Sequence, residues 1–301
     1  MTEPCKICGS TDWSPVYSGM IRDGAFGNTI EGEIYRCNGC GVDRLAEEMC
    51  IQPEAYETEE YRGILEQGLA LDDFFGHADP MQIHNLSAFW PLDFRGKRIA
   101  DIGTGGGSFP DHIASLAKEV VVIEPTDIYH PSLEKRGYRL FDYTADALME
   151  YQNKLDFVFS FQVIEHVIDP KLFLNEALGL LKPGGKLIIA TPNRNDIMMK
   201  LLPLDFPEFF YRTQHRWYFN QASLKNCYFN AVGGNMNNFS LRFVHTYGLS
   251  NALFWLKDKK PYGNTRMEGV NLVADQLWST YLESTCQSDT IYLMATKEPV
   301  D

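Results

Sequence analysis

The chain has 301 residues, of which 45% are hydrophobic and 22% are charged, a balance typical of a globular protein with a sizeable core. Its formal net charge is −13 and its Lys and Arg residues are scattered, which argues against a nucleic-acid partner because such a partner is normally met by a basic patch. The N-terminus lacks an apolar signal region and no run of about 18 apolar residues occurs, so we expect a cytoplasmic protein without a membrane partner.

Two Cys-x-x-Cys-Gly units stand at residues 5–9 and 37–41. The two-residue spacing lets both thiolates of one turn reach a single ion, and two such turns supply the four tetrahedral sulfurs of a structural zinc site. The glycine after each pair permits the positive φ that such a turn often needs. We therefore predict a zinc-binding module over residues 1–48, in which Zn²⁺ is held by Cys5, Cys8, Cys37 and Cys40.

Residues 49–95 are rich in aromatic side chains, and their glycines predict several short helices rather than one long helix. From residue 97 on, strands and helices alternate. The predicted strands are 97–103, 120–124, 138–142, 155–161 and 186–191, and the predicted helices are 108–119, 131–137, 145–153 and 169–181. Short apolar runs between helical periods predict a buried parallel sheet with helices on both faces. Two more strands are predicted at 239–248 and 289–298.

The first strand of this alternation runs into a glycine-rich turn, "RIADIGTGGGSF". A P-loop would need a Lys followed by Ser or Thr after the glycines, and no Lys is present there. The third glycine of the dinucleotide fingerprint falls on Ser108. Glu124, about 20 residues past the glycines, stands at the end of the next strand, where an acid accepts hydrogen bonds from ribose hydroxyls. That position fits a nicotinamide enzyme as well.

The pattern Asp101-x-Gly103-x-Gly105-x-Gly107 resembles motif I of the class I S-adenosylmethionine-dependent methyltransferases. Downstream, "LDFVFSFQVIEHVIDPKLFLNEALGLLKPGGKLIIATPN" resembles the fourth and fifth strands of that family, including its "KPGG" turn. The resemblance spans about residues 85–200 and the last two strands. It implies an α/β fold with a Rossmann-like doubly wound sheet of seven strands, the last strand antiparallel and inserted beside the fifth, in a methyltransferase domain over residues 96–301.

The resemblance also implies where S-adenosyl-L-methionine binds. In the family the first acid lies near the ammonium group of the donor, the glycines approach its methionine part, and residues just after the fourth strand touch it. The implied donor-binding residues are Asp101, Gly103, Thr104, Gly105, Glu124, Pro125, Phe161 and Gln162. The adenine contact is expected within residues 142–145, without a fixed register.

Two histidines are the candidate catalytic residues, because a hydroxyl acceptor is helped by a general base and His serves near pH 7. His166 opens the helix after the fourth strand, and His215 lies in "FFYRTQHRWYFNQASL". Helix capping and local packing explain the presence of His166 as well as a catalytic role does. For His215, a buried position that holds a lid is an equal alternative to catalysis. Ubiquinone-type O-methyltransferases carry a related Glu-x-x-Glu-His segment tied to a metal; Gln162 replaces its first acid here, which argues against a metal.

The segment 192–238 is expected to form an acceptor-site insertion, and its aromatic and basic residues suit a sugar or an anionic small molecule. The substrate-binding candidates are Tyr211 and Arg212 in this segment, together with Tyr56. A zinc module before such a domain resembles bacterial enzymes that methylate sugars, often nucleotide-linked, on oxygen or carbon. In that group a tyrosine-rich segment closes over the donor, and "YETEEY", which begins at Tyr56, is similar. We therefore expect residues 49–95 to form a donor-site lid.

The main hypothesis is an enzyme that methylates a small molecule. The alternatives are a zinc-ribbon methyltransferase acting on RNA or protein, a scaffold that kept the fold but lost turnover, and a nicotinamide oxidoreductase. The last is disfavoured by Ser108 and by the "KPGG" turn. The sequence does not predict the acceptor, the methylated atom, the general base or the oligomeric state.

Overall fold

The computed structural model describes residues 3–24, 28–58, 71–89, 91–234 and 237–298. The chain divides into two compact units. The first comprises Met1–Cys50, Thr191–Asn226 and Leu241–Tyr292, and the second comprises Ile51–Ala190, Cys227–Ser240 and Leu293–Asp301. Among the described residues, none of the helices combines the length and the apolar character needed to cross a bilayer.

A seven-stranded sheet has the order β10-β11-β8-β7-β4-β5-β6. Its strands are β4 (Arg98–Ile102), β5 (Glu119–Ile123), β6 (Arg139–Phe141), β7 (Leu155–Phe161), β8 (Leu181–Pro192), β10 (Phe239–Val244) and β11 (Thr290–Thr296). Strands β6, β5, β4, β7 and β8 pair in parallel. The amide of Gly184, early in β8, donates to Lys297 just after β11, so β11 runs antiparallel beside the fifth strand of the domain. This confirms the predicted fold class.

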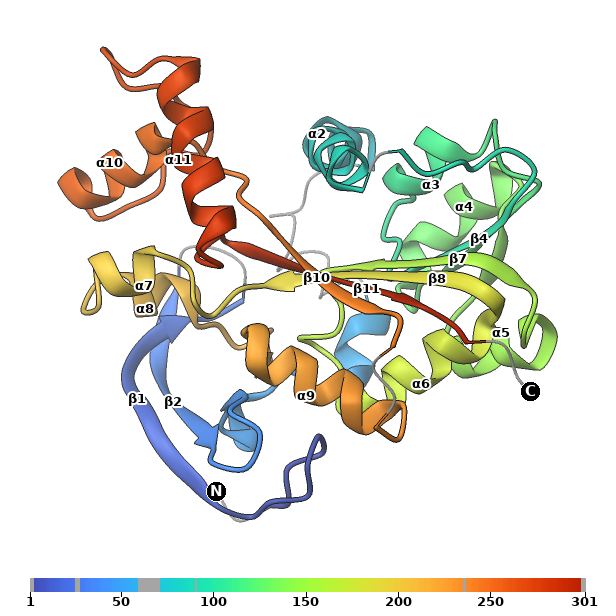
Figure 1. Ribbon diagram of the computed structural model, residues 1–301, viewed down its shortest axis with the longest axis horizontal. Helices are drawn as coiled ribbons and strands as arrows, with labels where there is room; N and C mark the ends of the chain where they lie inside the picture. Colours follow the sequence, from blue (N-terminus) through green and yellow to red (C-terminus); the bar gives the residue numbers. More distant parts are fainter. Residues whose placement is uncertain (1–2, 25–27, 59–70, 90, 235–236, 299–301) are drawn as a thin grey trace. The chain divides into compact units, whose positions relative to one another are not determined.

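Helices cover both faces of this sheet, as the apolar strands require. Figure 1 shows α2 (Leu71–Ala88), α3 (Ser108–Ile113) and α4 (His130–Lys135) over one face, and α5 (Thr144–Tyr151) and α6 (Pro170–Leu180) over the other. The helix predicted at 108–119 ends at Ile113, six residues earlier than expected. The reason is the register of the sheet: Glu119 pairs with Arg98, so the chain must leave the helix in time to enter β5.

The first unit contains a four-stranded antiparallel sheet with the order β1-β2-β3-β9. Its strands are β1 (Trp13–Arg22), β2 (Thr29–Cys37), β3 (Asp43–Leu45) and β9 (Trp217–Tyr218). The segments 1–48 and 192–238, predicted as a zinc-binding module and an acceptor-site insertion, share this sheet, because β3 pairs with β9 through Asp43 and Tyr218. Shared burial explains the pairing, because Ile34 and Leu45 lie in one core cluster with Phe210.

Buried ion pairs join the same two segments. The carboxylate of Asp43 has no exposed surface and accepts hydrogen bonds from Arg36 and Arg194. Glu47 accepts from Arg44 and Arg216, both almost fully buried. Each carboxylate compensates the desolvation of the buried groups that it contacts, although the Glu47 side chain itself is 38% exposed. Charge as well as packing therefore holds Asp43 to Arg194 and Glu47 to Arg216.

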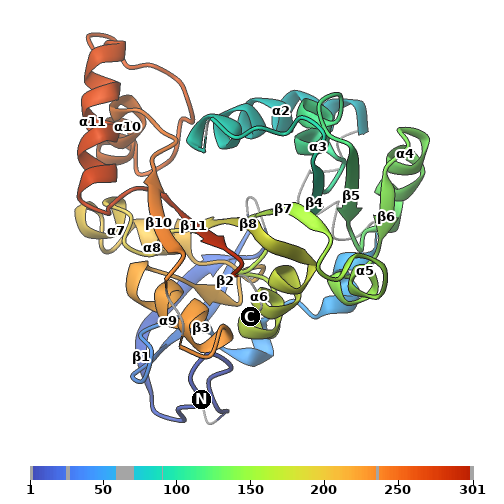
Figure 2. The same ribbon diagram turned by 45° about the vertical axis from the view of Figure 1, so that its right-hand side comes forward.

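The remaining elements of the first unit are short helices: η1 (Glu47–Met49), α7 (Met198–Leu201), α8 (Phe206–Phe210), α10 (Leu249–Asp258) and α11 (Leu272–Ser284). Helix α9 (Gln221–Ala231) spans the boundary between the units. Figure 2 shows α10 and α11 lying side by side. In the sequence they stand between β10 and β11, the last two strands of the large sheet. The sequence predicts those strands but neither helix.

Candidate functional site

The glycine-rich turn lies at the carboxyl end of β4, in the second unit. Gly103 has φ +73°, and its amide donates to the carbonyl of Ile123 at 2.7 Å. An ideal Cβ at this position would lie 2.3 Å from Cγ2 of Val163. Gly103 therefore has neither the dihedral angle nor the space for a larger residue, and the turn brings bare backbone to the edge of the sheet.

Two buried acids lie beside this turn. Asp101 is 3% exposed in β4, and Glu124, 6% exposed, directly follows β5. Burial raises the pKa of Asp101 to about 7; the nearby hydroxyl of Thr104 opposes this rise, and the charge of Glu124 adds to it. Because β4 and β5 are parallel neighbours, their carboxyl ends meet at one edge, where α/β sheets bind ligands.

Glu124 is held by backbone amides. Its Oε2 accepts from the amide of Gly105 at 2.7 Å, and its Oε1 accepts from the amide of Thr126 at 3.0 Å. Burial raises the pKa of Glu124, whereas its hydrogen bonds with Thr126 and Gly105 lower it. Glu124 thereby links the glycine turn to the loop after β5, which begins with the half-buried Pro125.

The residue after β7 has a strained backbone. Gln162 has φ +59°, its side chain is exposed, and its amide donates to the carbonyl of Ala190 at 2.9 Å. A left-handed conformation costs a non-glycine residue about 1–2 kcal/mol, and such strain clusters at functional sites. The neighbouring ring of Phe161 stacks on Phe89 with an interplanar angle of 2°. The Phe161 side chain thus contributes to an aromatic cluster at this edge of the sheet.

A short 3₁₀ helix, η2 (Pro53–Glu57), contacts the segments that follow β5 and β7. The carbonyl of Tyr56 accepts from Oγ1 of Thr126 at 2.7 Å, and its hydroxyl lies 3.3 Å from Nδ1 of His166. The carboxylate of Glu57 accepts from the hydroxyl of Tyr143, which lies in the segment where we expect the adenine contact. Residues 59–61 of the predicted tyrosine-rich motif lie outside the described residues.

Helix α2 contacts the glycine turn from the other side. An ideal Cβ on Gly106 would lie 2.5 Å from Cε1 of Phe74, so the ring of Phe74 touches the backbone of the turn. The hydroxyl of Ser108 donates to Oδ1 of Asp79 at 2.5 Å. Phe74 and Asp79 were not singled out in the sequence, because no local motif marks a residue that meets a turn about 30 positions away.

Three predicted residues, Tyr211, Arg212 and His215, belong to the first unit. Tyr211 is buried, and its ring meets that of Tyr218 edge-on at 4.8 Å. The hydroxyl of Tyr218 accepts from the amide of Arg212 and donates to its carbonyl, both at 2.9 Å. The amide of the buried His215 also donates to the Arg212 carbonyl, at 3.2 Å. Tyr211 is a core residue of this unit, and His215 and His166 stand in different units.

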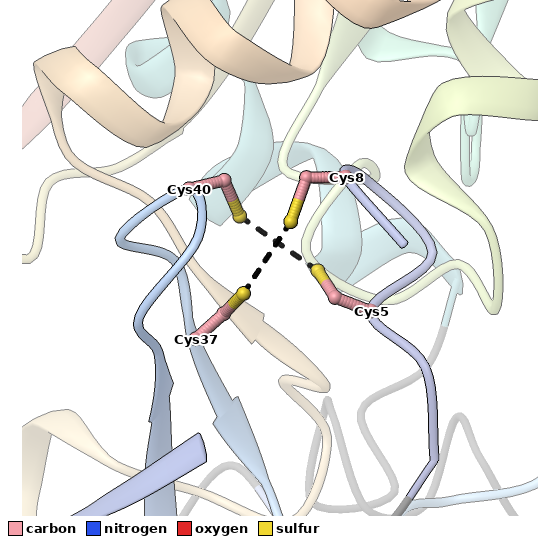
Figure 3. Close-up of side chains that lie close together, drawn as sticks. All are labelled: Cys5, Cys8, Cys37 and Cys40. Carbon is pink, nitrogen blue, oxygen red and sulfur yellow. Dashed lines mark hydrogen bonds between the residues drawn. The ribbon is translucent and has the colours of Figure 1, made fainter. Parts of the chain in front are cut away.

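Four cysteine side chains converge in the first unit, as Figure 3 shows. The Sγ atoms of Cys5 and Cys40 are 3.7 Å apart, those of Cys8 and Cys37 are 3.5 Å apart, and all four lie within 4.8 Å of one another. A tetrahedron with Zn–S bonds of about 2.3 Å has edges of about 3.8 Å, close to both of these distances, so the cluster suggests a zinc site.

The backbone around these cysteines forms two tight turns, each closed by a glycine in the left-handed conformation. Gly9 and Gly41 have φ of +76° and +77°, as predicted, and each amide donates to the carbonyl of the first cysteine of its pair. The side-chain amide of Asn226 donates to the carbonyl of Cys40 at 3.1 Å. The crowded sulfurs share hydrogen bonds, and the one with Cys40 lowers the pKa of Cys5 to about 5.

Comparison with known proteins decides the family. Residues 75–233 match the family model described as "Methyltransferase domain". The chain belongs to this methyltransferase family. The chain is 42% identical over 118 residues to a ubiquinone biosynthesis O-methyltransferase of Cereibacter sphaeroides, across 37% of this chain and 47% of the relative. It is 39% identical over 112 residues to the enzyme of the same name from Dinoroseobacter shibae, across 35% of this chain and 45% of that relative.

The chain thus spans about half the length of the curated relatives it matches. Among solved structures, a SAM dependent methyltransferase from Archaeoglobus fulgidus has a TM-score of 0.50 and 16% identity, and the match covers 75% of this chain and 97% of the other. This likeness shows the fold alone. Within the second unit, the predicted donor residues Asp101, Gly103, Gly105 and Glu124 come together at one sheet edge.

Proposed function

We propose that this chain transfers a methyl group from S-adenosyl-L-methionine to a hydroxyl oxygen of a small molecule. The arrangement of Asp101 and Glu124 carries the proposal: two buried acids on adjacent parallel strands flank a glycine turn. A donor with an ammonium group at one end and a ribose at the other offers a cation to one acid and two hydroxyl donors to the second. The family supports the reaction, and the names of the curated relatives support oxygen as the methylated atom.

Each residue of the proposed donor site has a defined task. Asp101 takes the ammonium group, whose charge favours the ionised carboxylate against the rise in pKa that burial causes. Glu124 takes the ribose hydroxyls, and the backbone at Gly103 and Gly105 approaches the methionine part. The exposed side chain of Gln162 borders the same edge. Residues of the lid, Tyr56 among them, exclude water from the donor.

The transfer itself is an in-line displacement. The acceptor oxygen gives its proton to a base, an O–C bond forms to the methyl carbon, the S–C bond breaks, and the sulfonium becomes a neutral thioether. Holding the two reactants in line supplies several kcal/mol of the rate enhancement, on the order of 7–11 kcal/mol at best. His166, whose Nδ1 lies 3.3 Å from the Tyr56 hydroxyl, is the candidate base in the second unit, and His215 is the candidate in the first.

We further propose a structural role for zinc. The four sulfurs fill every position of a tetrahedral ion, which leaves no open site for catalysis. In this division of the chain, residues 1–48 bind zinc, residues 49–95 cover the donor, and residues 96–301 form the catalytic domain with an acceptor-site insertion at 192–238. A hydroxyl of a sugar or nucleotide-linked sugar is the narrower form of the acceptor proposal, and methylation of a sugar carbon is its alternative.

Calorimetric titration with S-adenosylmethionine tests the donor site. We expect saturable binding in the micromolar range, no binding of NAD, and a loss of about tenfold or more in the Glu124→Gln variant, because one charged hydrogen-bond acceptor contributes about 1.5–3 kcal/mol. Glu134→Gln, an exposed acid on α4, is the matched control and should bind like the parent protein. Failure to bind millimolar donor would refute the proposal.

Turnover is tested with methyl-labelled donor and an acceptor panel of phenols, sugars, nucleotide-linked sugars, RNA and protein. Label transferred to oxygen of a small molecule supports the proposal. Label on carbon changes the atom, and label on RNA or protein changes the acceptor class. Donor binding without transfer to any acceptor favours a scaffold that has lost turnover.

A further inference from the structure

The glycine turn, residues 103–107, combines close approach with conformational freedom. Gly103, Gly105 and Gly107 all have positive φ, and glycine loses more backbone entropy on ordering than any other residue. A loop that binds a ligand through its backbone loses affinity when it must first be ordered on binding. A turn built from glycines therefore needs contacts from other elements that hold it in its binding conformation.

Glu124 and Arg136 both hold this turn in place. Glu124, at the end of β5, accepts from the amide of Gly105. Arg136 directly follows α4 in the same unit. Its Nη2 donates to the carbonyl of Gly106, and its Nη1 donates to the carbonyl of Gly107 at 3.5 Å. An ideal Cβ on Gly107 would lie 2.9 Å from Nη2, so the guanidinium group lies directly against the turn.

The guanidinium group of Arg136 is itself held in one orientation. Its Nε donates to the carbonyl of Ser132 at 3.1 Å, and its Nη1 donates to Oδ2 of Asp111 in α3 at 2.6 Å. The guanidinium carbon lies 5.4 Å from the ring centroids of both Phe75 and Tyr138. All three nitrogens thus donate, and a planar group restrained in this way fixes the carbonyls that it binds.

An ion pair alone does not account for this arrangement. The side chains of Arg136 and Asp111 are 24% and 37% exposed, and partly exposed pairs contribute little to stability. A lysine would also serve such a pair, whereas two neighbouring carbonyls need a planar fork with separate donors. Because Asp111 balances the charge of Arg136, the guanidinium group acts on the turn through hydrogen-bond geometry rather than through net charge.

We propose that Arg136 is a positioning residue of the donor site, which holds the carbonyls of Gly106 and Gly107 and so keeps the glycine turn in the conformation that binds S-adenosyl-L-methionine. This inference rests on the proposed function and adds to it a residue that acts through the turn. Because the peptide bond is planar, fixing these two carbonyls also fixes the amides of Gly107 and Ser108. The turn then meets the donor already ordered, which preserves affinity.

Calorimetric titration of the full chain with S-adenosylmethionine tests the proposal. Arg136→Gln should weaken donor binding about tenfold or more, because charge-assisted hydrogen bonds to the turn are lost. Arg139→Gln is the matched control: Arg139 is half exposed in the same unit, pairs with Glu150 at 2.7 Å and should leave donor binding unchanged. Asp111→Asn breaks the ion pair but keeps the bonds to the carbonyls, so it should weaken binding far less than Arg136→Gln.

Two further measurements separate positioning from a general loss of stability. Methylguanidinium at millimolar concentration should restore donor affinity in Arg136→Ala, whereas methylammonium, which has the charge without the planar fork, should not. Hydrogen exchange of residues 103–109, followed by mass spectrometry without donor, should be faster in Arg136→Gln than in the parent protein and unchanged in Arg139→Gln.

Donor binding or turn exchange in Arg136→Gln equal to that of the parent protein would overturn this inference alone. Equal weakening in Asp111→Asn would do the same, because the ion pair would then explain the effect, and so would equal rescue by methylammonium. Absence of donor binding in the parent protein would instead refute the proposed function, and this inference with it.

Discussion

Replacing Gly103 by alanine tests the glycine turn, because two separate costs arise there. The dihedral angle of +73° costs an alanine about 1–2 kcal/mol. The new Cβ would also lie 2.3 Å from Cγ2 of Val163, and overpacking of this kind costs about 1–3 kcal/mol. We expect Gly103→Ala to lower the free energy of unfolding by about 2–5 kcal/mol.

Gly96→Ala is the matched control. Gly96 has nearly the same dihedral angle, +71°, but nothing lies within 4 Å of its ideal Cβ. This variant should lose about 1–2 kcal/mol from the backbone alone, so the two variants should differ by about 1–3 kcal/mol. Urea unfolding of the full chain, followed by circular dichroism, measures both, with an unchanged m-value as the check that the variants are comparable.

A double-mutant cycle isolates the contact. In the Gly103→Ala/Val163→Ala variant the clashing methyl is absent, so the two substitutions together should cost about 1–3 kcal/mol less than their separate costs added. Donor affinity should fall in Gly103→Ala and stay unchanged in Gly96→Ala. An equal loss of stability in the two single variants, with no coupling in the cycle, would refute the close approach of the turn to Val163.

Three further predictions concern single sites. The pKa of Asp101 is about 7 in the folded chain and 3.8 without burial, so between these pH values the folded protein holds a proton that the unfolded chain has lost. Without donor, the free energy of unfolding should therefore fall as the pH rises through this window. Asp101→Asn should remove this pH dependence, measured by urea unfolding at pH 5 and pH 8. Gln162→Gly should raise the unfolding free energy by about 1 kcal/mol by relieving the left-handed strain, yet weaken donor binding in calorimetry; weaker folding would contradict the strain. Metal analysis should find one zinc ion per chain, lost in Cys37→Ser together with thermal stability but kept in Cys286→Ser, whose cysteine lies outside the cluster.

The large sheet could be predicted because its strands are buried on both faces. Such strands appear in a sequence as short apolar runs, and the prediction for β7, residues 155–161, matches the structure at both ends. The donor edge could be predicted for a related reason: the glycine turn and the acids directly follow strands, and the topology of parallel strands brings their ends together.

Contacts between distant segments were not predictable in the same way. Strand β9 has two residues, too few to show a period, and its pairing with β3 depends on a core shared by residues far apart in the chain. Arg136 meets the glycine turn from the end of α4, and Phe74 meets it through the packing of α2. Each of these contacts depends on tertiary structure, which leaves no trace in a local sequence window.

Strand β3 is synthesised long before its partner strand, β9. Asp43 pairs with Tyr218, and at about 5–20 residues per second roughly 9–35 s separate their appearance from the ribosome. Throughout that interval one edge of β3 has no strand beside it, while both cysteine turns are already present. We expect a zinc ion captured at this stage to clamp the nascent hairpin and to protect it from pairing with other chains. Zinc starvation during expression should therefore cause a larger loss of folded chain than removal of zinc from the finished protein by a chelator.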